Sequence, residues 1–269
     1  MYKIGCIGTG AMGSALMAGV RKKLEENQIA LYDKDSEKAV GLAEKLAGVV
    51  CNSEEEVVKN SEIVVFAVKP NVLSSVLEKT SGCLEGLKAR HPVFVSIAAG
   101  ISLSSIEEYL PEEAIIRVMP NMPALTGNGM IGLTGNSFVK KEVLEAVSSL
   151  LSGAGLTDIV PESMMDAVTA VSGSGPAFVF MFIQALADGA VKCGMPRQQA
   201  VKYAAQTVMG SAKTVLETGR HPEELKDSVC SPGGTTIDGV QKLEEYGFRN
   251  SVMKAVEAAF LKSKAMGKN

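Results

Sequence analysis

A glycine fingerprint near the start of the chain constrains its fold more than any other feature. The residues Gly8-Thr9-Gly10-Ala11-Met12-Gly13 lie between an apolar run, Tyr2 to Ile7, and a helical stretch, and a second apolar run ends at Asp33. In a strand–turn–helix–strand unit, the first Gly permits a tight turn, the second lets backbone approach a pyrophosphate, and the third lets helix pack closely on strand. N–H groups at the helix start favour phosphate, and a carboxylate ending the second strand accepts ribose hydroxyls. We therefore predict a dinucleotide site rather than an ordinary glycine turn.

The first part of the chain, to about residue 150, alternates apolar runs of strand length with amphipathic stretches of helix length. This alternation is typical of a mostly parallel sheet with helices on both faces, an α/β fold of Rossmann-like type. We expect strands at 3–7, 28–33, 62–68, 93–97 and 114–118, with a weaker candidate at 129–134. We expect helices at 11–25, 36–47, 71–79, 102–109 and 139–152.

Several polar residues come directly after predicted strands. They are Asp33, Asn52, Lys69 and Asn121. Because ligands bind at the carboxyl ends of the strands in open α/β sheets, these positions are candidates for ligand contacts. The alternative for each one is an ordinary loop residue.

The second part of the chain has a different pattern. At 269 residues the chain exceeds the length of about 150 that is typical of one domain. Glycines and a proline around 152–163 break the alternation, and the pattern beyond them is helical. We predict a dinucleotide-binding domain at 1–160 and an all-helical substrate-binding and dimerisation domain at 161–269. Its helices are expected at 162–192 with a Gly/Pro interruption, 196–218, 222–228, 235–246 and 248–266.

The run Ala177 to Ile183 is apolar on every face of a helix. So much apolar surface is difficult to bury within a small helical domain. We therefore expect a helical interface in a homodimer, the alternative being a central helix buried within one chain.

The composition of the chain argues against several kinds of partner. A net charge of −3, 5% aromatic residues and no Trp leave little to attract phosphate backbones or to stack on bases. The five Cys are scattered and form no C-x-x-C pair, which suggests neither disulfides nor a metal site. No uninterrupted apolar stretch approaches about 18 residues, and no leader-like segment precedes the first strand. We therefore expect a cytoplasmic protein that binds neither nucleic acid nor membrane.

A second glycine-rich segment, Ser231-Pro232-Gly233-Gly234-Thr235-Thr236, lies in the helical half. Successive Gly residues free their backbone N–H groups, and the two Thr open a helix, so the segment combines a nest with a helix N-terminus. We predict that it binds a ligand carboxylate. The alternative is that Ser231 and the threonines only cap the helix.

The sequence offers few His or Lys residues where a base for a dehydrogenase is expected. The chain has only two His, both followed by Pro, and the stretch Gly173 to Ile183 contains no Lys. Oxidation of an alcohol needs a base to take the hydroxyl proton. An imine, in contrast, can arrive already protonated and needs positioning against a nicotinamide rather than a strong acid. The sequence therefore favours a C=N substrate.

These motifs together resemble the pyrroline-5-carboxylate reductase family. The resemblance rests on the glycine fingerprint, Ala67-Val68-Lys69-Pro70, Ser96 to Gly100, Met119 to Ala124, Val171 to Phe178 and Ser231 to Thr236. It extends from the first strand to the final helix. It implies reduction of 1-pyrroline-5-carboxylate to L-proline by NADPH or NADH, in a chain that dimerises through its helical domain, with further assembly of dimers.

The resemblance also implies roles for individual residues. Residues Ile7 to Met12 would contact the cofactor phosphates, and Ala67 to Pro70 with Ala98 would line the groove toward the nicotinamide. Ser231, Thr235 and Thr236, with the backbone of Gly233 and Gly234, would bind the substrate carboxylate. The Thr236 hydroxyl, as the catalytic group, would bond to the ring nitrogen.

One departure from the family leaves the cofactor open. Asp33 would repel the 2′-phosphate of NADPH, whereas Lys34 would attract it. The family often has an Asn near residue 54, where this chain has Glu54, so Asn52 is only a shifted candidate for the ribose contact. Two other readings stay open: an oxidoreductase like the hydroxyacid dehydrogenases, and a dinucleotide-binding regulatory protein without turnover.

Overall fold

The computed structural model describes residues 1–87 and 91–267 and contains two compact units. One unit comprises Met1–Ser174 and Ala259–Asn269, and the other comprises Gly175–Ala258. Residues 268 and 269, at the end of the predicted second domain, lie outside the described residues. The predicted domain boundary near residue 160 stays a prediction, and the contacts divide the chain after Ser174.

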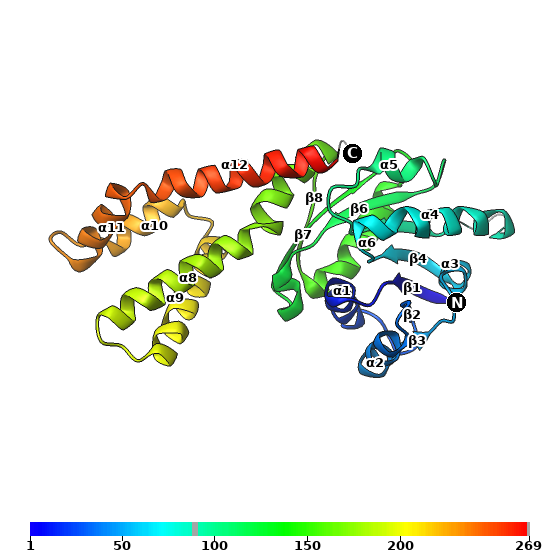
Figure 1. Cartoon of the computed structure of the whole chain (residues 1–269), viewed down its shortest axis with the longest axis horizontal. Helices are drawn as coiled ribbons and strands as arrows, with labels where there is room; N and C mark the ends of the chain where they lie inside the picture. The colour runs from blue at the N-terminus through cyan, green and yellow to red at the C-terminus, as the bar shows by residue number, and fades with distance from the viewer. Residues whose placement is uncertain (88–90, 268–269) are drawn as a thin grey trace. The chain divides into compact units, whose positions relative to one another are not determined.

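The first unit is built on one eight-stranded sheet with the order β3-β2-β1-β4-β5-β6-β7-β8 (Figure 1). The strands are β1 (Tyr2–Ile7), β2 (Ile29–Tyr32), β3 (Val49–Val50), β4 (Ser61–Phe66), β5 (Val93–Ser96), β6 (Ile115–Met119), β7 (Gly129–Gly135) and β8 (Gly155–Ile159). Every neighbouring pair is parallel except β6 and β7. The predicted mostly parallel, Rossmann-like sheet is confirmed, and its carboxyl edge carries the fingerprint.

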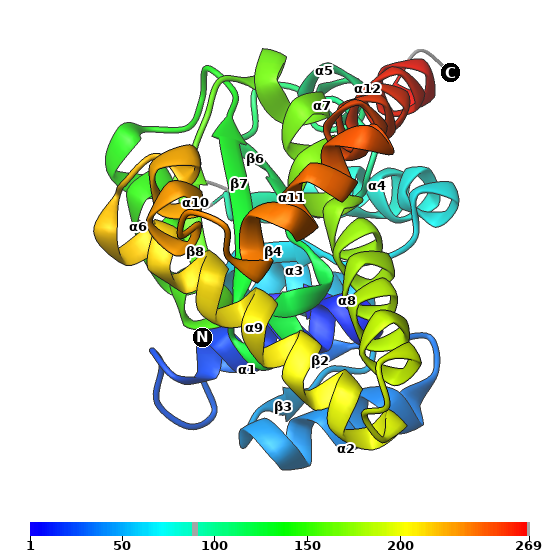
Figure 2. The ribbon, with the colours of Figure 1, turned by 90° about the vertical axis from the view of Figure 1, so that its left-hand side faces the viewer.

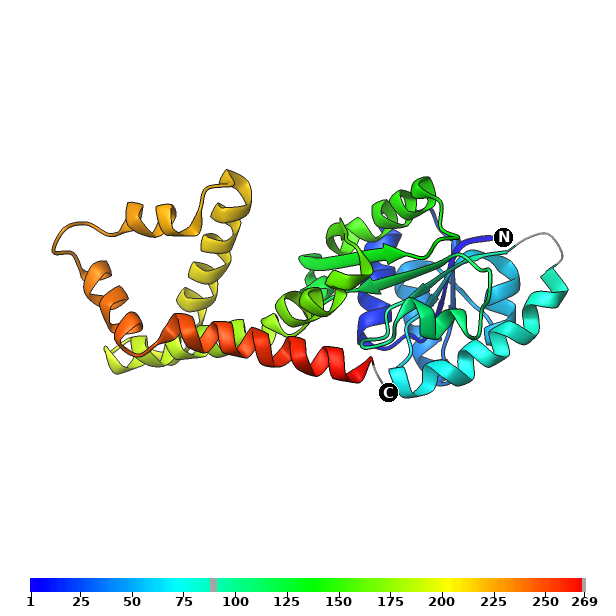
Figure 3. The same cartoon turned by 90° about the horizontal axis from the view of Figure 1, so that it is seen from above.

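Helices cover both faces of the sheet, as the alternation predicts. One face packs against α1 (Ala11–Arg21), α2 (Ser36–Leu46) and α6 (Lys141–Leu151), and the other against α3 (Glu54–Asn60), α4 (Pro70–Leu84) and α5 (Leu103–Glu107). Figure 3 shows the sheet between α6 and α4. The result is two apolar cores, which fix the strand ends that border the site.

Three short elements differ from the prediction. Strand β3 has only two residues, so its apolar run is too short to predict a strand from the sequence. Strand β8 lies in the glycine-rich stretch that was expected to be a domain boundary. Helix α3 begins with three Glu and buries only Val57 and Val58, so it shows little apolar periodicity. Its start is stabilised instead by the Ser53 side chain, which accepts a hydrogen bond from the Glu56 N–H at 3.1 Å.

The bounds of three predicted helices also change. The helix expected at 11–25 ends at Arg21, and the one expected at 102–109 covers only Leu103–Glu107. The helix expected at 71–79 extends over Pro70–Leu84, where a Pro at the start is compatible with the first turn. The weak strand candidate at 129–134 forms β7.

The predicted helical half is confirmed. It starts with short turns at Glu162–Met164, Met165–Val168 (α7) and Thr169–Gly173, followed by α8 (Gly175–Lys192), α9 (Arg197–Thr218), α10 (Pro222–Val229), α11 (Thr235–Glu245) and α12 (Phe248–Met266). In the second unit α8 and α9 converge toward the turn that joins them (Figure 2), where they pack through Ala187, Ala200 and Ala204. These small residues allow close approach but bury little apolar surface.

Helix α8 leaves most of its apolar surface exposed in the single chain. Phe180 is 52% exposed and Met181 is 73% exposed, and Ala187 is the buried residue of this helix. By length and composition alone, residues 162–192 also form a stretch apolar enough to cross a membrane. The alternative, a central helix buried within one chain, is therefore wrong for α8. Its apolar surface is not buried by the rest of the single chain.

Candidate functional site

A groove of about 520 Å³ lies along the carboxyl edge of the sheet, where β1, β2 and β4 end. Seven of the residues predicted to bind the cofactor line it: Ile7, Gly8, Gly10, Asp33, Ala67, Val68 and Lys69. The fold thus brings together three segments that are far apart in the sequence.

The three glycines of the fingerprint have distinct surroundings that fit a pyrophosphate. Gly8 has φ of +99°, a conformation that only Gly adopts readily, and a Cβ on Gly13 would lie 2.3 Å from the Gly8 carbonyl oxygen. Apart from Gly10 itself and its two neighbours in the chain, no atom of the described residues lies within 4 Å of where a Gly10 Cβ would be, and no described side chain caps α1 at this residue. Gly8 therefore permits the turn, and Gly13 permits the close packing of helix on strand. Gly10 leaves open space beside the uncapped N–H groups of α1, as phosphate binding requires.

Asp33 follows β2 and faces the fingerprint loop. Its Oδ2 accepts the Thr9 N–H at 2.6 Å and the Thr9 hydroxyl at 3.1 Å, and its Oδ1 accepts the Asp35 N–H at 3.0 Å. Burial raises the pKa of Asp33, but these donors and the charge of Lys38 lower the pKa more, so that it falls below its ordinary value. The carboxylate is therefore ionised and largely engaged with its own chain.

The other predicted cofactor residues lie outside the lining of this groove. The Thr9 side chain is buried, Met12 packs against the core, and Ala98, just after β5, is 5% exposed. The side-chain amide of Asn52 donates a hydrogen bond to Glu56 Oε2 at 3.1 Å, so it is bonded within the chain. The remaining three, Ala11, Gly13 and Pro70, belong to the first turns of α1 and α4. Asn121 is structural, because its side chain bonds Ser172 and Met130.

Two charged residues of the groove were not predicted from the sequence as a pair. Glu54 opens α3, and Lys79 extends from the face of α4 that also carries Val72, Ser75 and Val76. Their side chains form an ion pair with Nζ and Oε2 2.7 Å apart, and this bond raises the pKa of Lys79. The spacing i, i+3, i+4, i+7 of the α4 residues could have indicated the lining face.

The predicted substrate loop, Ser231 to Thr236, joins α10 to α11 in the second unit. The Gly234 N–H donates to the Ser231 carbonyl at 3.0 Å, so this N–H closes a turn rather than remaining free as expected. Gly233 has φ of +65°, and no side chain caps α11, which begins after Gly234. Within the described residues, the hydroxyls of Ser231, Thr235 and Thr236 make no hydrogen bond. The loop therefore does not use these hydroxyls as helix caps.

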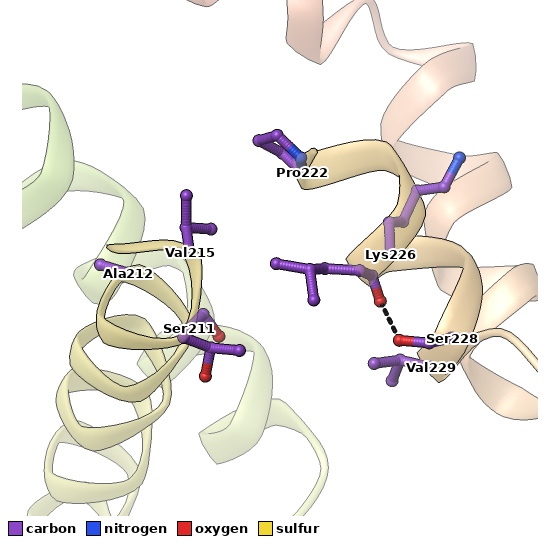
Figure 4. A pocket seen from close by; sticks show the side chains of 9 residues that line it. Ser211, Ala212, Val215, Pro222, Lys226, Ser228 and Val229 are labelled. Atoms are coloured by element: carbon purple, nitrogen blue, oxygen red, sulfur yellow. Dashed lines mark hydrogen bonds between the residues drawn. The ribbon is translucent and has the colours of Figure 1, made fainter. Parts of the chain in front are cut away.

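A separate hollow of about 470 Å³ lies between α9 and α10 (Figure 4). Small and branched side chains such as Ala212, Val215 and Val229 line it. The Ser228 hydroxyl donates a hydrogen bond to the Leu225 carbonyl at 2.7 Å. The ammonium of Lys226 pairs with Glu223 at 2.8 Å. The lining is mainly apolar, and the Ser211 hydroxyl is a polar group in it that makes no hydrogen bond within the described residues.

Comparison with known families assigns both halves of the chain. Residues 3–100 match the family described as NADP oxidoreductase, coenzyme F420-dependent, and residues 162–266 match the family described as pyrroline-5-carboxylate reductase dimerisation. The fold and the groove thus define an NAD(P)H-dependent oxidoreductase with a helical dimerisation region.

Individual relatives narrow this class. The pyrroline-5-carboxylate reductase of Methanosarcina acetivorans is 45% identical over 99% of this chain and 98% of its own length, and that of Escherichia coli is 43% identical over 99% of both. The structure of the Coxiella burnetii reductase has a TM-score of 0.93 at 30% identity, covering 100% of this chain and 99% of that one. The Plasmodium falciparum reductase, solved with NADP bound, has a TM-score of 0.86 at 34% identity, covering 99% and 98%. The chain belongs to the pyrroline-5-carboxylate reductase family.

Proposed function

We propose that this chain reduces 1-pyrroline-5-carboxylate to L-proline with NAD(P)H, using the first unit for the cofactor and the Ser231–Thr236 loop for the substrate. The observation that carries the proposal is the state of this loop. Its three hydroxyls make no described hydrogen bond, and the helix that follows has no side-chain cap. Capping alone does not explain such a set of uncommitted donors, whereas a carboxylate and a ring nitrogen would use them.

Within the loop, the donors divide between two parts of the substrate. The N–H groups of Thr235 and Thr236 lie in the first turn of α11, where the helix dipole favours a carboxylate. The Ser231 and Thr235 hydroxyls and the Gly233 N–H complete this end, while the Gly234 N–H, bonded to the Ser231 carbonyl, shapes the turn. The Thr236 hydroxyl bonds the ring nitrogen and fixes the orientation of the C=N bond.

The chemistry asks little of the protein beyond this positioning. When bound, the reduced nicotinamide supplies a hydride, which forms the new C–H bond at the imine carbon while the C=N π electrons move to nitrogen. Because the imine nitrogen already carries its proton in the iminium form, no side chain has to act as a strong acid. The lack of Lys between Gly173 and Ile183 is compatible with this reaction and leaves alcohol oxidation without an obvious base in this stretch.

The same proposal covers partners and compartment. The exposed apolar faces of α8 and of the hollow between α9 and α10 are those that a second copy of the chain would cover in a homodimer, and dimers could assemble further. A net charge of −3 supports neither nucleic acid nor an anionic membrane surface as a partner. We expect a soluble, cytoplasmic enzyme.

Oxidation of NADH and of NADPH, followed with and without 1-pyrroline-5-carboxylate, tests this function. We expect oxidation that depends on the substrate, with L-proline as product. Reduction of NAD⁺ or NADP⁺ with a panel of 2- and 3-hydroxy acids tests the alternative of a hydroxyacid dehydrogenase. Binding of NAD(P)H without turnover on any of these compounds would instead support a regulatory protein and would contradict the proposal.

A further inference from the structure

The turn that follows β5 lies at the carboxyl edge of the sheet and, from Ile97 to Ser102, belongs to no helix or strand. Strand β5 runs parallel to β4 and pairs with it, so the turn lies beyond the groove-lining segment Ala67 to Lys69 along this edge. In a sheet of this strand order, the fingerprint half binds one nucleotide and the strands beyond the switch point border the other. The turn after β5 therefore borders the nicotinamide half of a bound dinucleotide.

Side chains hold both ends of this turn. At its start the Ala98 N–H donates to the Ser96 hydroxyl at 3.3 Å, and at its end the Leu103 N–H donates to Glu162 Oε1 at 2.7 Å. Gly100 lies between them with φ of +75°. The Leu103 N–H belongs to the first turn of α5, whose N–H groups have no partner inside the helix. Glu162, which is distant in the sequence, thus fixes the place where the turn ends.

The side chain of Arg117 holds the Glu162 carboxylate in this place. It is only 9% exposed, and its Nη1 donates to the same Oε1 at 3.3 Å. Arg117 lies beside Ser96 in the register of β6 with β5, so the guanidinium extends from the sheet itself. Because the Glu162 side chain is 36% exposed, we assign this contact to geometry rather than to electrostatic stability.

Two other charged residues line the hollow of about 350 Å³ beside Glu162. Asp166 Oδ1 accepts the Ser263 hydroxyl at 2.7 Å, and Lys264 is exposed. Among the described residues, Arg117 is the cation that pairs with Glu162. The carboxylate that accepts the Leu103 N–H is therefore oriented by the buried guanidinium.

We propose that Glu162 is a positioning residue for the nicotinamide half of the cofactor, which it orients through the turn after β5, with Arg117 holding its carboxylate. This inference rests on the proposed dinucleotide groove. Hydride transfer depends steeply on the distance and angle between C4 of the nicotinamide and the imine carbon. A looser turn therefore affects the nicotinamide and the hydride step, whereas the adenosine half stays bound at the fingerprint.

Calorimetric titration tests this division by comparing a whole cofactor with one that lacks the nicotinamide. NADH is matched with ADP-ribose, and NADPH with 2′-phospho-ADP-ribose, so the comparison does not depend on which cofactor the protein prefers. Glu162→Ala removes the acceptor of the Leu103 N–H. It should weaken the tighter-binding reduced cofactor about fivefold or more and change the Kd of its matched ADP-ribose by less than about twofold. Glu162→Gln keeps an acceptor oxygen and should restore most of the affinity.

Turnover gives a second readout, which a purely structural role would not move. The reduced cofactor would carry deuterium at both C4 positions of the nicotinamide. Glu162→Ala should lower kcat and increase the isotope effect on kcat, because a misplaced nicotinamide makes hydride transfer limit the rate to a greater extent.

Two further variants separate positioning from stability. Glu162→Ala leaves the Arg117 charge largely buried without its partner, which destabilises a fold. The double variant Arg117→Met with Glu162→Met has no such charge, and it should reproduce the loss of nicotinamide binding. Glu108→Ala removes an exposed carboxylate at the other end of α5 and should change neither Kd.

Equal weakening of the reduced cofactor and of its matched ADP-ribose by the double variant would overturn the inference. So would a Kd of the reduced cofactor that stays within about twofold of the wild type in the double variant, or a Glu162→Gln variant as impaired as Glu162→Ala. These outcomes differ from failure of the proposed function, which would leave the pattern of Kd values intact but give no oxidation with 1-pyrroline-5-carboxylate.

Discussion

At the scale of single residues, the fingerprint glycines separate cofactor binding from stability. Gly10→Ala adds a methyl group that would meet no described residue within 4 Å other than its chain neighbours, so we expect an unchanged Tm. The same methyl group occupies space that the pyrophosphate needs, and it should weaken NADH and NADPH about tenfold or more. Thermal unfolding and nicotinamide fluorescence measure the two effects.

Gly13→Ala is the matched comparison. Its Cβ would lie 2.3 Å from the Gly8 carbonyl oxygen, so the backbone of the turn has to move. Overpacking of this kind costs about 1–3 kcal/mol, and we expect a lower Tm in the absence of any cofactor. Equal Tm values for the two variants would contradict the roles assigned to these glycines.

The Thr236 hydroxyl belongs to the same scale. If it bonds the ring nitrogen, Thr236→Ala should lower kcat/KM for 1-pyrroline-5-carboxylate about tenfold or more and leave the Kd of NADH unchanged. Thr218→Ala is a suitable control, because the Thr218 hydroxyl donates to the Thr214 carbonyl within α9 at 2.7 Å. Steady-state kinetics decide the matter, and full activity of Thr236→Ala would show that the hydroxyl has another role.

At the scale of elements, an ion-pair network holds the two helices that flank the substrate loop. Arg249 at the start of α12 bonds Glu223 of α10 at 2.9 Å and Glu244 of α11 at 2.6 Å. The hydrogen bonds from Arg249 and then Lys226 lower the pKa of Glu223 to about 2. Because these groups are exposed, we assign the network to orientation of the loop rather than to overall stability.

Arg249→Met tests this assignment. Releasing α10 from α11 should raise KM for 1-pyrroline-5-carboxylate by a few-fold, with the Kd of NADH unchanged, since the cofactor groove lies in the other unit. Kinetics and fluorescence titration give the two values. A change in the Kd of NADH equal to that in KM would show that the substitution acts on the fold as a whole.

Acid should loosen the same helices. The pKa of Glu223 is lowered in the folded chain, so its contribution is present above its ordinary value of 4.5 and is lost as the pH falls toward about 2. We expect amide exchange in α10 and α11 to accelerate over this interval in the wild type. Glu223→Gln, which cannot form the ion pairs, should lack that part of the acceleration.

The elements also show how far the sequence alone leads. The long strands and helices were predictable, because β1 and β4 bury continuous apolar runs and α1 buries apolar residues at helical spacing. Helix α3 was missed because it buries only Val57 and Val58 and so shows little apolar periodicity, although Ser53 followed by Glu56 three residues later is a sequence signature of a helix start. Because α3 was not predicted, the ion pair between Glu54 and Lys79 could not be predicted either. The engagement of Asp33 by Thr9 was equally inaccessible, since only the folded turn brings that N–H to the carboxylate.

At the scale of the whole molecule, the exposed apolar face of α8 predicts self-association. Wild-type protein should sediment with at least twice the mass of one chain. Met181→Asp places a charge on a residue that is 73% exposed in the single chain, and it should produce monomers that remain folded by circular dichroism. Val40→Asp, at a site 43% exposed on α2 of the sheet unit, should leave the assembly unchanged. A wild type that sediments as a monomer would contradict the prediction.

The reaction itself is tested most directly by following the transferred hydrogen. The protein would be incubated with 1-pyrroline-5-carboxylate and NADH or NADPH in which both hydrogens at C4 of the nicotinamide are deuterium, and the product examined by mass spectrometry and NMR. We predict L-proline with one deuterium, located on the ring carbon that belonged to the imine. Proline without deuterium at that carbon, or no proline with either cofactor, would contradict the assignment of this chain as an imine-reducing enzyme.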